Sequence, residues 1–371
     1  MIRSVFIYGG ILAASLAIAW LRYTAEPSVD LSDTIPLLQG DAEDITQVTW
    51  TDDDEVAIVD QKTDDHGEYL WVSYTRTVEV EPTPDLPEDP EPPEAPEDPE
   101  ALDGEEEEPE PEPEPETRDE KQVFKAGDKG DELLANLSPL VALRKLADVD
   151  AEKLESIGLA DPQGQMTVVR KGRTATFDIG GEAFGTRDIY LRDTSDGVIY
   201  LVDDELLRPL RYARTRLPDR TLFSFERSDL VSAVLSDPDG MSLDLTQKNP
   251  LDSDSATWVR ASAPDESSGQ LETWMGKALQ VKSTSSATEG EEPEGLELAF
   301  RLTVQSRSDG TETLEVFQAE NGEWWGKSEH TRALVKMLKG VTGDLAEDVS
   351  SILDGTPGEP EVPEGLEAPG Q

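Results

Sequence analysis

The alternation of hydrophobic and polar residues predicts short strands through the first half of the chain. Residues 45–50, 56–59 and 69–74 alternate apolar and polar side chains, and Asp-rich breaks separate them. A period of two is typical of antiparallel strands that bury one face. Four further strands, joined by Gly-rich turns, are expected at residues 166–170, 174–179, 189–192 and 198–202.

Helical spacing separates these groups of strands. Residues 131–148 place leucines near a period of 3.6, apart from a break at Pro139, and this pattern predicts a helix. A short helix is expected at residues 150–157. Another helix, over residues 203–211, is expected to close this first unit.

The second half of the chain repeats the same order of elements. Three strands come first, then a helix, further strands and a closing helix. The expected ranges are 230–235, 242–246 and 257–261, helix 271–281, strands 296–306 and 311–319, and helix 328–340. We therefore predict an α+β fold of two related units, each an antiparallel sheet with helices packed on one face.

The remaining segments divide the chain into folded and extended parts. The first unit is expected to comprise residues 40–78 and 121–220, and the second residues 221–352. About half of the insert at residues 79–120 is Asp or Glu and more than a quarter is Pro, so this acidic insert cannot bury a core. We expect the insert and the tail at residues 353–371 to be disordered.

The N-terminus carries an uncharged apolar run at residues 4–21, which has the length of one transmembrane helix. Arg3 precedes the run and an acidic chain follows it, which predicts an anchor over residues 1–24 with a cytoplasmic N-terminus and an extracytoplasmic body. The alternative is a cleaved signal peptide with Ala17-Ile18-Ala19 as the small-residue cleavage site. Trp20 and Tyr23, placed like interfacial aromatics, favour a retained anchor.

Charge and composition narrow the function. The 371 residues include 81 Asp or Glu against 32 Lys or Arg, a net charge of −49, which argues against nucleic-acid binding. There is no cysteine and there are two histidines, so thiolate chemistry, disulfides and multi-histidine metal sites are excluded. We expect no cofactor and no defined metal site, although the acidic insert could attract divalent cations loosely through its charge density.

No motif predicts an enzyme. Residues 179–185 (IGGEAFG) lack the Lys-Ser/Thr of a phosphate-binding loop and precede a strand, so we interpret them as a turn. Ser328, Glu329 and His330 are adjacent rather than arranged as a catalytic triad, and we interpret Glu329 and His330 as residues at a helix start. Asp-rich stretches at 52–55 and 193–197 lack calcium-loop spacing and are expected to be hairpin turns.

Two groups of residues are candidates for contact with a partner. One is the only cationic cluster, made of Arg208, Arg211, Arg214, Arg216 and Arg220. It could dock an anionic partner, namely lipid headgroups, an acidic protein or the chain's own insert, or it could form ordinary ion pairs with Asp203, Asp204, Glu205 and Asp219.

The other group is the pair Trp324 and Trp325. Successive residues of a strand point to opposite faces, so at most one of the two is expected in the core. The second would be exposed or would lie in a partner's groove.

A series of short motifs in the first unit resembles a known bacterial family. Residues 157–162 (IGLADP) precede a strand, and 177–181 (FDIGG), 190–192 (YLR), 198–202 (VIYLV) and 218–220 (PDR) follow in order. This order resembles the domain of unknown function 4340, over roughly residues 40–225. The resemblance implies a single N-terminal helix in the inner membrane, a periplasmic body and a link to ABC-type transport systems of the gliding-motility kind. No catalytic residue is established for the family, and the acidic insert departs from the short linker found there.

Two hypotheses for function follow. The first is a non-enzymatic, membrane-anchored accessory or scaffold protein, possible partners being subunits of an ABC transporter. The alternative is a periplasmic ligand-binding module with a site between the two units, near the arginine cluster. A closed apolar seam between the units would favour the scaffold, and an open cleft lined by Arg and Trp would favour ligand capture.

Overall fold

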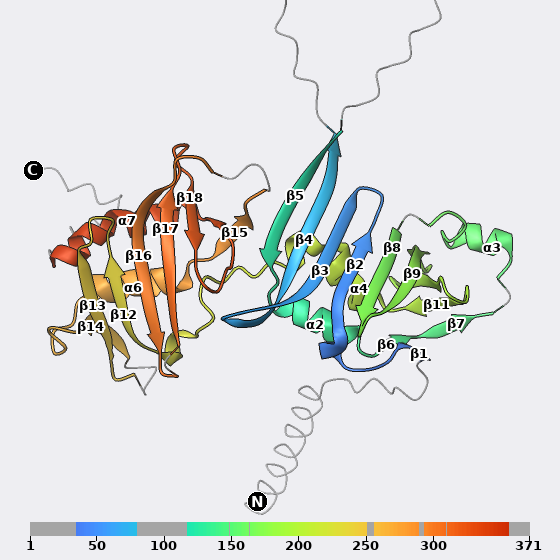
Figure 1. Cartoon of the computed structure of the whole chain (residues 1–371), viewed down its shortest axis with the longest axis horizontal. Coiled ribbons are helices and arrows are strands. Elements are labelled where there is room, and N and C mark those ends of the chain that lie inside the picture. The colour runs from blue at the N-terminus through green and yellow to red at the C-terminus, as the bar shows by residue number, and fades with distance from the viewer. Residues whose placement is uncertain are drawn as a thin grey trace, which may run out of the picture.

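The structure is a computed structural model that describes residues 35–79, 117–147, 149–162, 164–250, 256–288, 293–308 and 310–355. Most of these residues form two large antiparallel sheets that stand next to each other (Figure 1). The predicted anchor, most of the acidic insert and most of the tail lie outside the described residues. Within the described part, no helix has the length and apolar character needed to cross a bilayer.

The first sheet has nine strands in the order β5-β4-β3-β2-β8-β9-β10-β11-β7. A separate pair, β1 and β6, lies beside it. The strands are β1 (Ile35–Leu38), β2 (Ile45–Thr51), β3 (Glu55–Asp64), β4 (Gly67–Glu79), β5 (Thr117–Lys125), β6 (Leu140–Ala142), β7 (Arg144–Leu146), β8 (Gly164–Arg170), β9 (Arg173–Glu182), β10 (Ile189–Asp193) and β11 (Ile199–Val202). The helices of this unit are α2 (Asp128–Asn136), α3 (Ala151–Ser156), α4 (Asp204–Arg211) and α5 (Ala213–Arg216).

The second sheet has eight strands in the order β14-β13-β12-β16-β17-β18-β19-β15. They are β12 (Leu230–Ser236), β13 (Ser242–Lys248), β14 (Thr257–Arg260), β15 (Ser283–Ser286), β16 (Glu297–Ser306), β17 (Thr311–Gln318), β18 (Trp324–Lys327) and β19 (Val335–Met337). Helices α6 (Gly269–Gln280) and α7 (Lys339–Asp354) pack on it.

The two sheets share one strand order. The sequence β4-β3-β2-β8-β9-β10-β11-β7 of the first corresponds step by step to β14-β13-β12-β16-β17-β18-β19-β15 of the second. Strand β5 has no counterpart, because it is added at the edge next to β4. The predicted α+β class with antiparallel sheets is confirmed.

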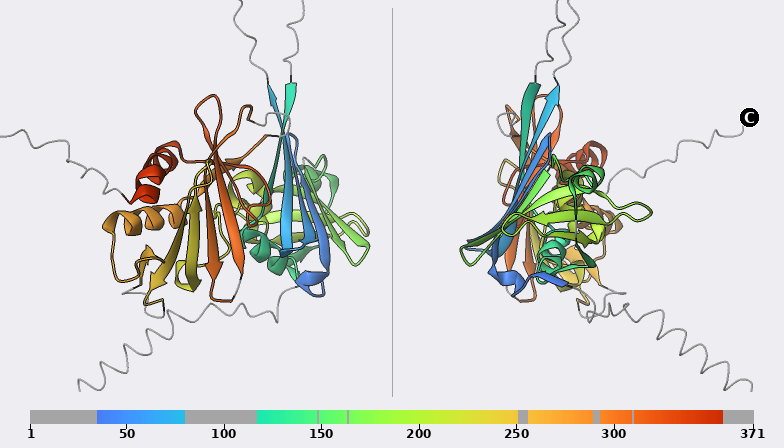
Figure 2. Two further views of the ribbon diagram at one scale, coloured as in Figure 1. Left: turned by 60° about the vertical axis from the view of Figure 1, so that its left-hand side comes forward. Right: turned by 90° about the vertical axis from the view of Figure 1, so that its right-hand side faces the viewer.

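Each sheet buries one face under its helices. One core joins the first sheet to α2 and α4 and runs from Ile45 to Leu217, and a second joins the second sheet to α6 and α7 and runs from Leu222 to Leu353. The helices lie to one side of the two sheets, and the opposite face carries no helix of the described chain (Figure 2). Strand β4 illustrates the consequence: Leu70 and Val72 are buried, whereas Tyr69 and Trp71 point to the uncovered face.

Two predicted helices are wrong at their boundaries. Helix α2 ends at Asn136, and residues 140–146 form the short strands β6 and β7 instead of continuing the helix to 148. Pro139 cannot donate the next helical hydrogen bond. The closing helix is α7 and starts at Lys339, not Ser328; between Ser328 and Thr331, side chains and backbone hydrogen-bond locally, which competes with helix formation.

The acidic insert ends earlier along the chain than predicted. Residues 117–120 were assigned to the insert, but they belong to β5, and Thr117 pairs directly with Glu79 of β4. The segment that lies outside the described residues here is therefore 80–116, between two neighbouring antiparallel strands. Strand β5 was missed because Phe124 is its only buried residue, as suits a polar edge strand.

The turn predicted at residues 179–185 is wrong in its first part, because residues 179–182 belong to β9, where Gly180 and Gly181 have different surroundings. A Cβ on Gly180 would lie 2.6 Å from the Ile157 carbonyl oxygen and 2.9 Å from Leu159 Cγ, whereas a Cβ on Gly181 would meet nothing closer than 3.6 Å. We expect Gly180→Ala to lower the free energy of unfolding by about 1–3 kcal/mol through overpacking. Gly181→Ala should stay within about 0.5 kcal/mol. Urea denaturation of both variants checks this, and equal effects would contradict the close approach.

Candidate functional site

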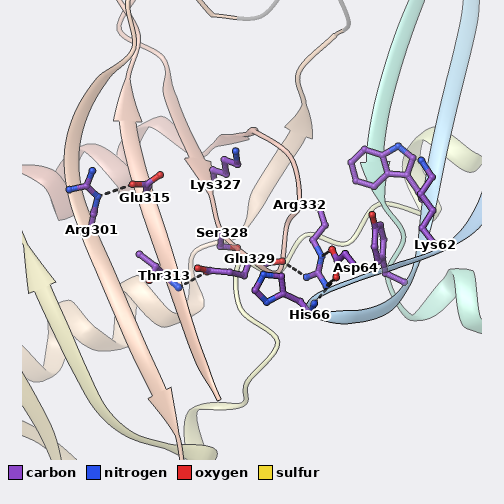
Figure 3. Close-up of a pocket in the computed structure, with 12 residues that line it drawn as sticks. Lys62, Asp64, His66, Arg301, Thr313, Glu315, Lys327, Ser328, Glu329 and Arg332 are labelled. Carbon is purple, nitrogen blue, oxygen red and sulfur yellow. Dashed lines mark hydrogen bonds and ion pairs between the residues drawn. The ribbon is translucent and has the colours of Figure 1, made fainter. Parts of the chain in front are cut away.

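A groove lies between the two sheets, on the face that the helices leave uncovered (Figure 3). Its volume is about 780 Å³. Strands β3 and β4 form one wall, strands β16 to β18 form the other, and the loop between β18 and β19 lies between them. The lining residues are Lys62, Asp64, His66, Tyr69, Trp71, Arg301, Thr313, Glu315, Lys327, Ser328, Glu329 and Arg332.

The first wall is aromatic and cationic. Tyr69 and Trp71 are two residues apart on β4 and therefore share a face, where their rings meet edge to face with centroids 6.1 Å apart. Lys62 lies directly opposite Tyr69 on β3, and its Nζ is 5.5 Å from the centre of the Trp71 ring. This is a cation–π arrangement that leaves the lysine exposed.

The second wall is a row of charges across three strands. Arg301 of β16 faces Glu315 of β17, which faces Lys327 of β18. Arg301 Nε donates to Glu315 Oε1 at 2.7 Å, and the Thr313 amide donates to Glu329 Oε2 at 2.6 Å. Lys327 forms no ion pair within the described part of the chain.

The loop of residues 328–334 joins the walls. Arg332 Nε and Nη2 donate to the two oxygens of Asp64 at 2.8 and 3.1 Å, and its guanidinium lies 5.0 Å from the centre of the Tyr69 ring. The hydrogen bond from Arg332 lowers the pKa of the Asp64 carboxyl. Arg332 adopts a φ of 59°, a left-handed conformation that is uncommon for a non-glycine residue.

Next to the groove, a polar network connects the units. Asp219, in the connection between them, accepts from Lys125 Nζ of β5 at 2.8 Å and from the Thr221 hydroxyl at 2.7 Å. His330 of the 328–334 loop places Nε2 2.7 Å from Asp219 Oδ2. Burial alone would raise the pKa of Asp219, but the hydrogen bonds from His330, Lys125 and Thr221 outweigh it and hold the pKa well below its usual value.

This network has the residue types of a catalytic triad without its geometry. In a triad the acid and the nucleophile bind opposite nitrogens of the imidazole. Here the same Nε2 lies 2.7 Å from Asp219 and 3.0 Å from the Thr221 hydroxyl, and Lys125 Nζ is also within 3.1 Å of it. No group of three or more His, Asp or Glu side chains in the described residues is arranged to hold a metal ion. The arrangement fastens two units together.

The predicted arginine cluster is divided in two. Arg208 and Arg211 bind the buried Asp204 at 2.8 and 2.7 Å, and Arg211 also binds Glu182 at 3.2 Å. Burial opposes ionisation of Asp204, but these arginines overcome it and lower its pKa. Arg208 and Arg211 therefore form ion pairs within the chain, as the alternative prediction stated, and both bind Asp204.

The remaining three arginines of that cluster are exposed. The guanidinium of Arg216 lies 5.9 Å from the centre of the Tyr212 ring. Arg216 and Arg220 line a second cavity of about 730 Å³ at the junction of the units, which His330 also lines. Arg214 lines neither this cavity nor the groove. Asp219 binds Lys125 and His330 rather than an arginine.

Both tryptophans at 324 and 325 are buried, so the expectation that the second is exposed or lies in a partner's groove is wrong, although only Trp324 belongs to the core under the helices. Their exposed fractions are 8% and 5%. Trp324 packs in the core beneath α7, next to Gly343. Trp325 points to the other face, but β18 is an interior strand, and Trp325 lies between the directly opposite residues Phe317 and Lys336.

The sequence analysis did not predict that the residues lining the groove come together. Tyr69 and Trp71 were placed correctly on a strand, and their outward positions in its alternation were the available signal. His330 was interpreted as a residue at a helix start, but it is buried in a loop and binds Asp219. No local pattern indicates the pairing of Arg332 with Asp64, which are 268 residues apart.

Comparison with known proteins gives one match. The family model described as Domain of unknown function (DUF4340) matches residues 126–297, which confirms the resemblance seen in the motifs. No curated protein and no solved structure matches the chain. The matched range spans about two thirds of the first unit and more than half of the second, and the residues that line the groove lie outside it.

Proposed function

We propose that this protein, which carries a DUF4340 domain over residues 126–297, is a non-enzymatic binding protein that captures a ligand between its two sheets. The observation that carries the proposal is the open groove lined by Tyr69, Trp71, Arg301 and Arg332. Its volume of about 780 Å³ lies in the range of ligand sites, roughly 300–1,000 Å³.

The nature of the seam favours ligand capture over a purely structural scaffold. The units meet through polar side chains, chiefly the network at Asp219 and the Arg332–Asp64 pair, and not through a continuous apolar seam. A small polar junction next to an open groove is typical of units that enclose a ligand. The groove residues come from both units, so binding would depend on their relative position.

The cellular setting of the proposal rests on the sequence. The apolar run at residues 4–21 supports a single anchor in the inner membrane with the body in the periplasm. The family resemblance supports an accessory role in an ABC-type transport complex. In that setting, the groove would hold an extended polypeptide segment.

Photo-cross-linking in native membranes tests the proposal. A photo-reactive lysine analogue that keeps the ammonium group replaces Lys327 in the full-length chain, and a second variant carries it at Arg214, outside the groove. We expect a specific adduct from position 327 only, and we expect Trp71→Ala to reduce its yield about tenfold, which corresponds to roughly 1.4 kcal/mol of lost binding.

Two results would contradict this function. Absence of any adduct at position 327 would argue that the groove holds no ligand. Transporter subunits recovered equally with and without Trp71→Ala would support the scaffold hypothesis instead, because the contact would then lie on another surface.

A further inference from the structure

We infer that the groove selects acidic, proline-rich, extended segments, and that residues 80–116 of the same chain occupy it. This inference rests on the proposed function, since it names the ligand class of that same groove. Three features support this ligand class: the lysines without ion pairs in the groove, its aromatic rings, and the place where the segment leaves the sheet.

The groove is lined by four Lys or Arg side chains and three Asp or Glu side chains, so its charge is positive on balance. Each of its acids already has a donor: Arg332 for Asp64, Arg301 for Glu315, and the Thr313 amide for Glu329. Lys62 and Lys327, by contrast, form no ion pair within the described part of the chain. They lie on opposite walls, so a ligand between them would meet an ammonium group on each side.

The aromatic wall complements these charges. Tyr69 and Trp71 follow the same face of β4 and are only partly buried. Proline-rich segments in the polyproline II conformation bind grooves lined by aromatic rings, because the rings pack on proline and the backbone is ordered in advance. Two rings with flanking ammonium groups therefore fit a ligand in which prolines and carboxylates alternate.

Residues 80–116 have this composition. Of these 37 residues, 18 are Asp or Glu, 12 are Pro and none is Lys or Arg. The last part, residues 108–116, reads EPEPEPEPE, so a proline alternates with a glutamate at each step. Elsewhere in the chain, this chemistry recurs only faintly, at residues 289–294 (EGEEPE) and in the tail from Gly355.

The attachment points bring the segment within reach. Glu79 and Thr117 are paired on β4 and β5, and Trp71 lies eight residues back along β4, about 26 Å away at 3.3 Å per residue. A segment of 37 residues could extend over roughly 115 Å at 3.1 Å per residue, about twice the path out and back. Tethering at both ends gives an effective concentration of about millimolar, so weak contacts suffice.

The arginine cluster is a poorer receptor for the same segment. Arg208 and Arg211 already share Asp204, and Arg211 also binds Glu182. Only Arg214, Arg216 and Arg220 remain exposed, and the ring beside them is Tyr212 alone, whereas the groove has two rings on one strand face. The groove offers free ammonium groups and rings together.

The test measures binding between residues 80–116, supplied as a separate peptide, and a chain from which these residues have been removed. In one variant, Asn-Gly replaces residues 80–116 and closes the β4–β5 hairpin, which the direct pairing of Glu79 with Thr117 permits. The probe is a fluorescent peptide of residues 80–116, measured by anisotropy. We expect binding to the loop-closed chain that weakens about tenfold between roughly 50 and 300 mM salt, because exposed charges are screened.

Matched variants locate the contact. Trp71→Ala and Lys327→Glu, each in the loop-closed chain, should weaken peptide binding about tenfold, and Arg214→Ala should leave it unchanged. The full-length chain should bind the peptide at least about tenfold more weakly, since its own segment competes. It should also remain monomeric in analytical ultracentrifugation.

Three outcomes would overturn the inference. They are no peptide binding at low salt, binding that Trp71→Ala and Lys327→Glu leave intact, and self-association of the full-length chain that the loop-closed variant loses. The last outcome would place the segment in a second copy. If the peptide fails to bind while the adduct at position 327 persists, the inference fails alone; if both are absent, the proposed function fails with it.

Discussion

Replacing Asp219 with alanine is expected to lower the free energy of unfolding by about 3–5 kcal/mol, because it leaves the buried His330 and the largely buried Lys125 without their shared acceptor. The carboxylate binds Lys125, Thr221 and His330, and the side chains of Lys125 and His330 are only 15% and 10% exposed. Urea denaturation near neutral pH measures the loss. Asp54→Ala is the matched control, since Asp54 is exposed and its side chain forms no bond in the described chain.

A double substitution separates charge from packing. In Asp219→Asn with Lys125→Met, neither partner remains as an uncompensated charge, so the loss should be smaller than the sum of the single losses. Additive losses would contradict the assignment of this pair as the centre of the junction.

The same carboxylate predicts how stability depends on pH. The folded pKa of Asp219 is depressed, so its contribution is fully present above the unfolded value of about 3.9 and is lost as the pH falls toward the folded value. Unfolding experiments between about pH 3 and 7 should therefore show stability falling below roughly pH 4. The fall should be shallower in Asp219→Asn, and an identical profile would mean that other carboxylates dominate.

Most strands could be located along the chain from the sequence, because burial of one face imposes a period of two. Strands such as β4, which alternates Leu70, Val72 and Tyr74 inward, carry that signal clearly. Strand β5 does not, because an edge strand that buries only Phe124 has no apolar alternation. Residues 328–338 were wrongly predicted as helical for a different reason. Strand β19 is held by its pairing with β18 and β15, which is a tertiary effect that the local sequence does not indicate.

The candidate site was less accessible from sequence than the fold. The Asp204–Arg208 pair has i,i+4 spacing on a helix, so local reasoning could identify it as an ion pair. The groove, however, joins Lys62 and Tyr69 to residues near position 330, and nothing local couples these segments. The arginine cluster was chosen as a candidate site because of its charge. The lysines without ion pairs, Lys62 and Lys327, lie instead on opposite walls of the groove.

Loss of a tryptophan should lower stability in the core of the second unit but lower ligand binding in the groove. Trp274 is 1% exposed, donates from Nε1 to the Leu345 carbonyl oxygen at 2.9 Å and meets Phe300 edge to face at 5.7 Å. It therefore joins α6 to α7 and to β16. We expect Trp274→Ala to lower the free energy of unfolding by about 3–5 kcal/mol, and Trp274→Phe by less, since a ring is retained.

Trp71 provides the matched comparison, because it lies on the uncovered face and packs against Lys62 and Tyr69 rather than in a core. Trp71→Ala should cost no more than about 1 kcal/mol in urea denaturation, yet it should reduce capture of the ligand about tenfold. A loss of stability equal to that of Trp274→Ala would mean that Trp71 is structural, and weakened binding would then report unfolding. The proposal requires the two effects to separate, since a partly buried ring beside Lys62 on the uncovered face contributes to recognition and little to folding.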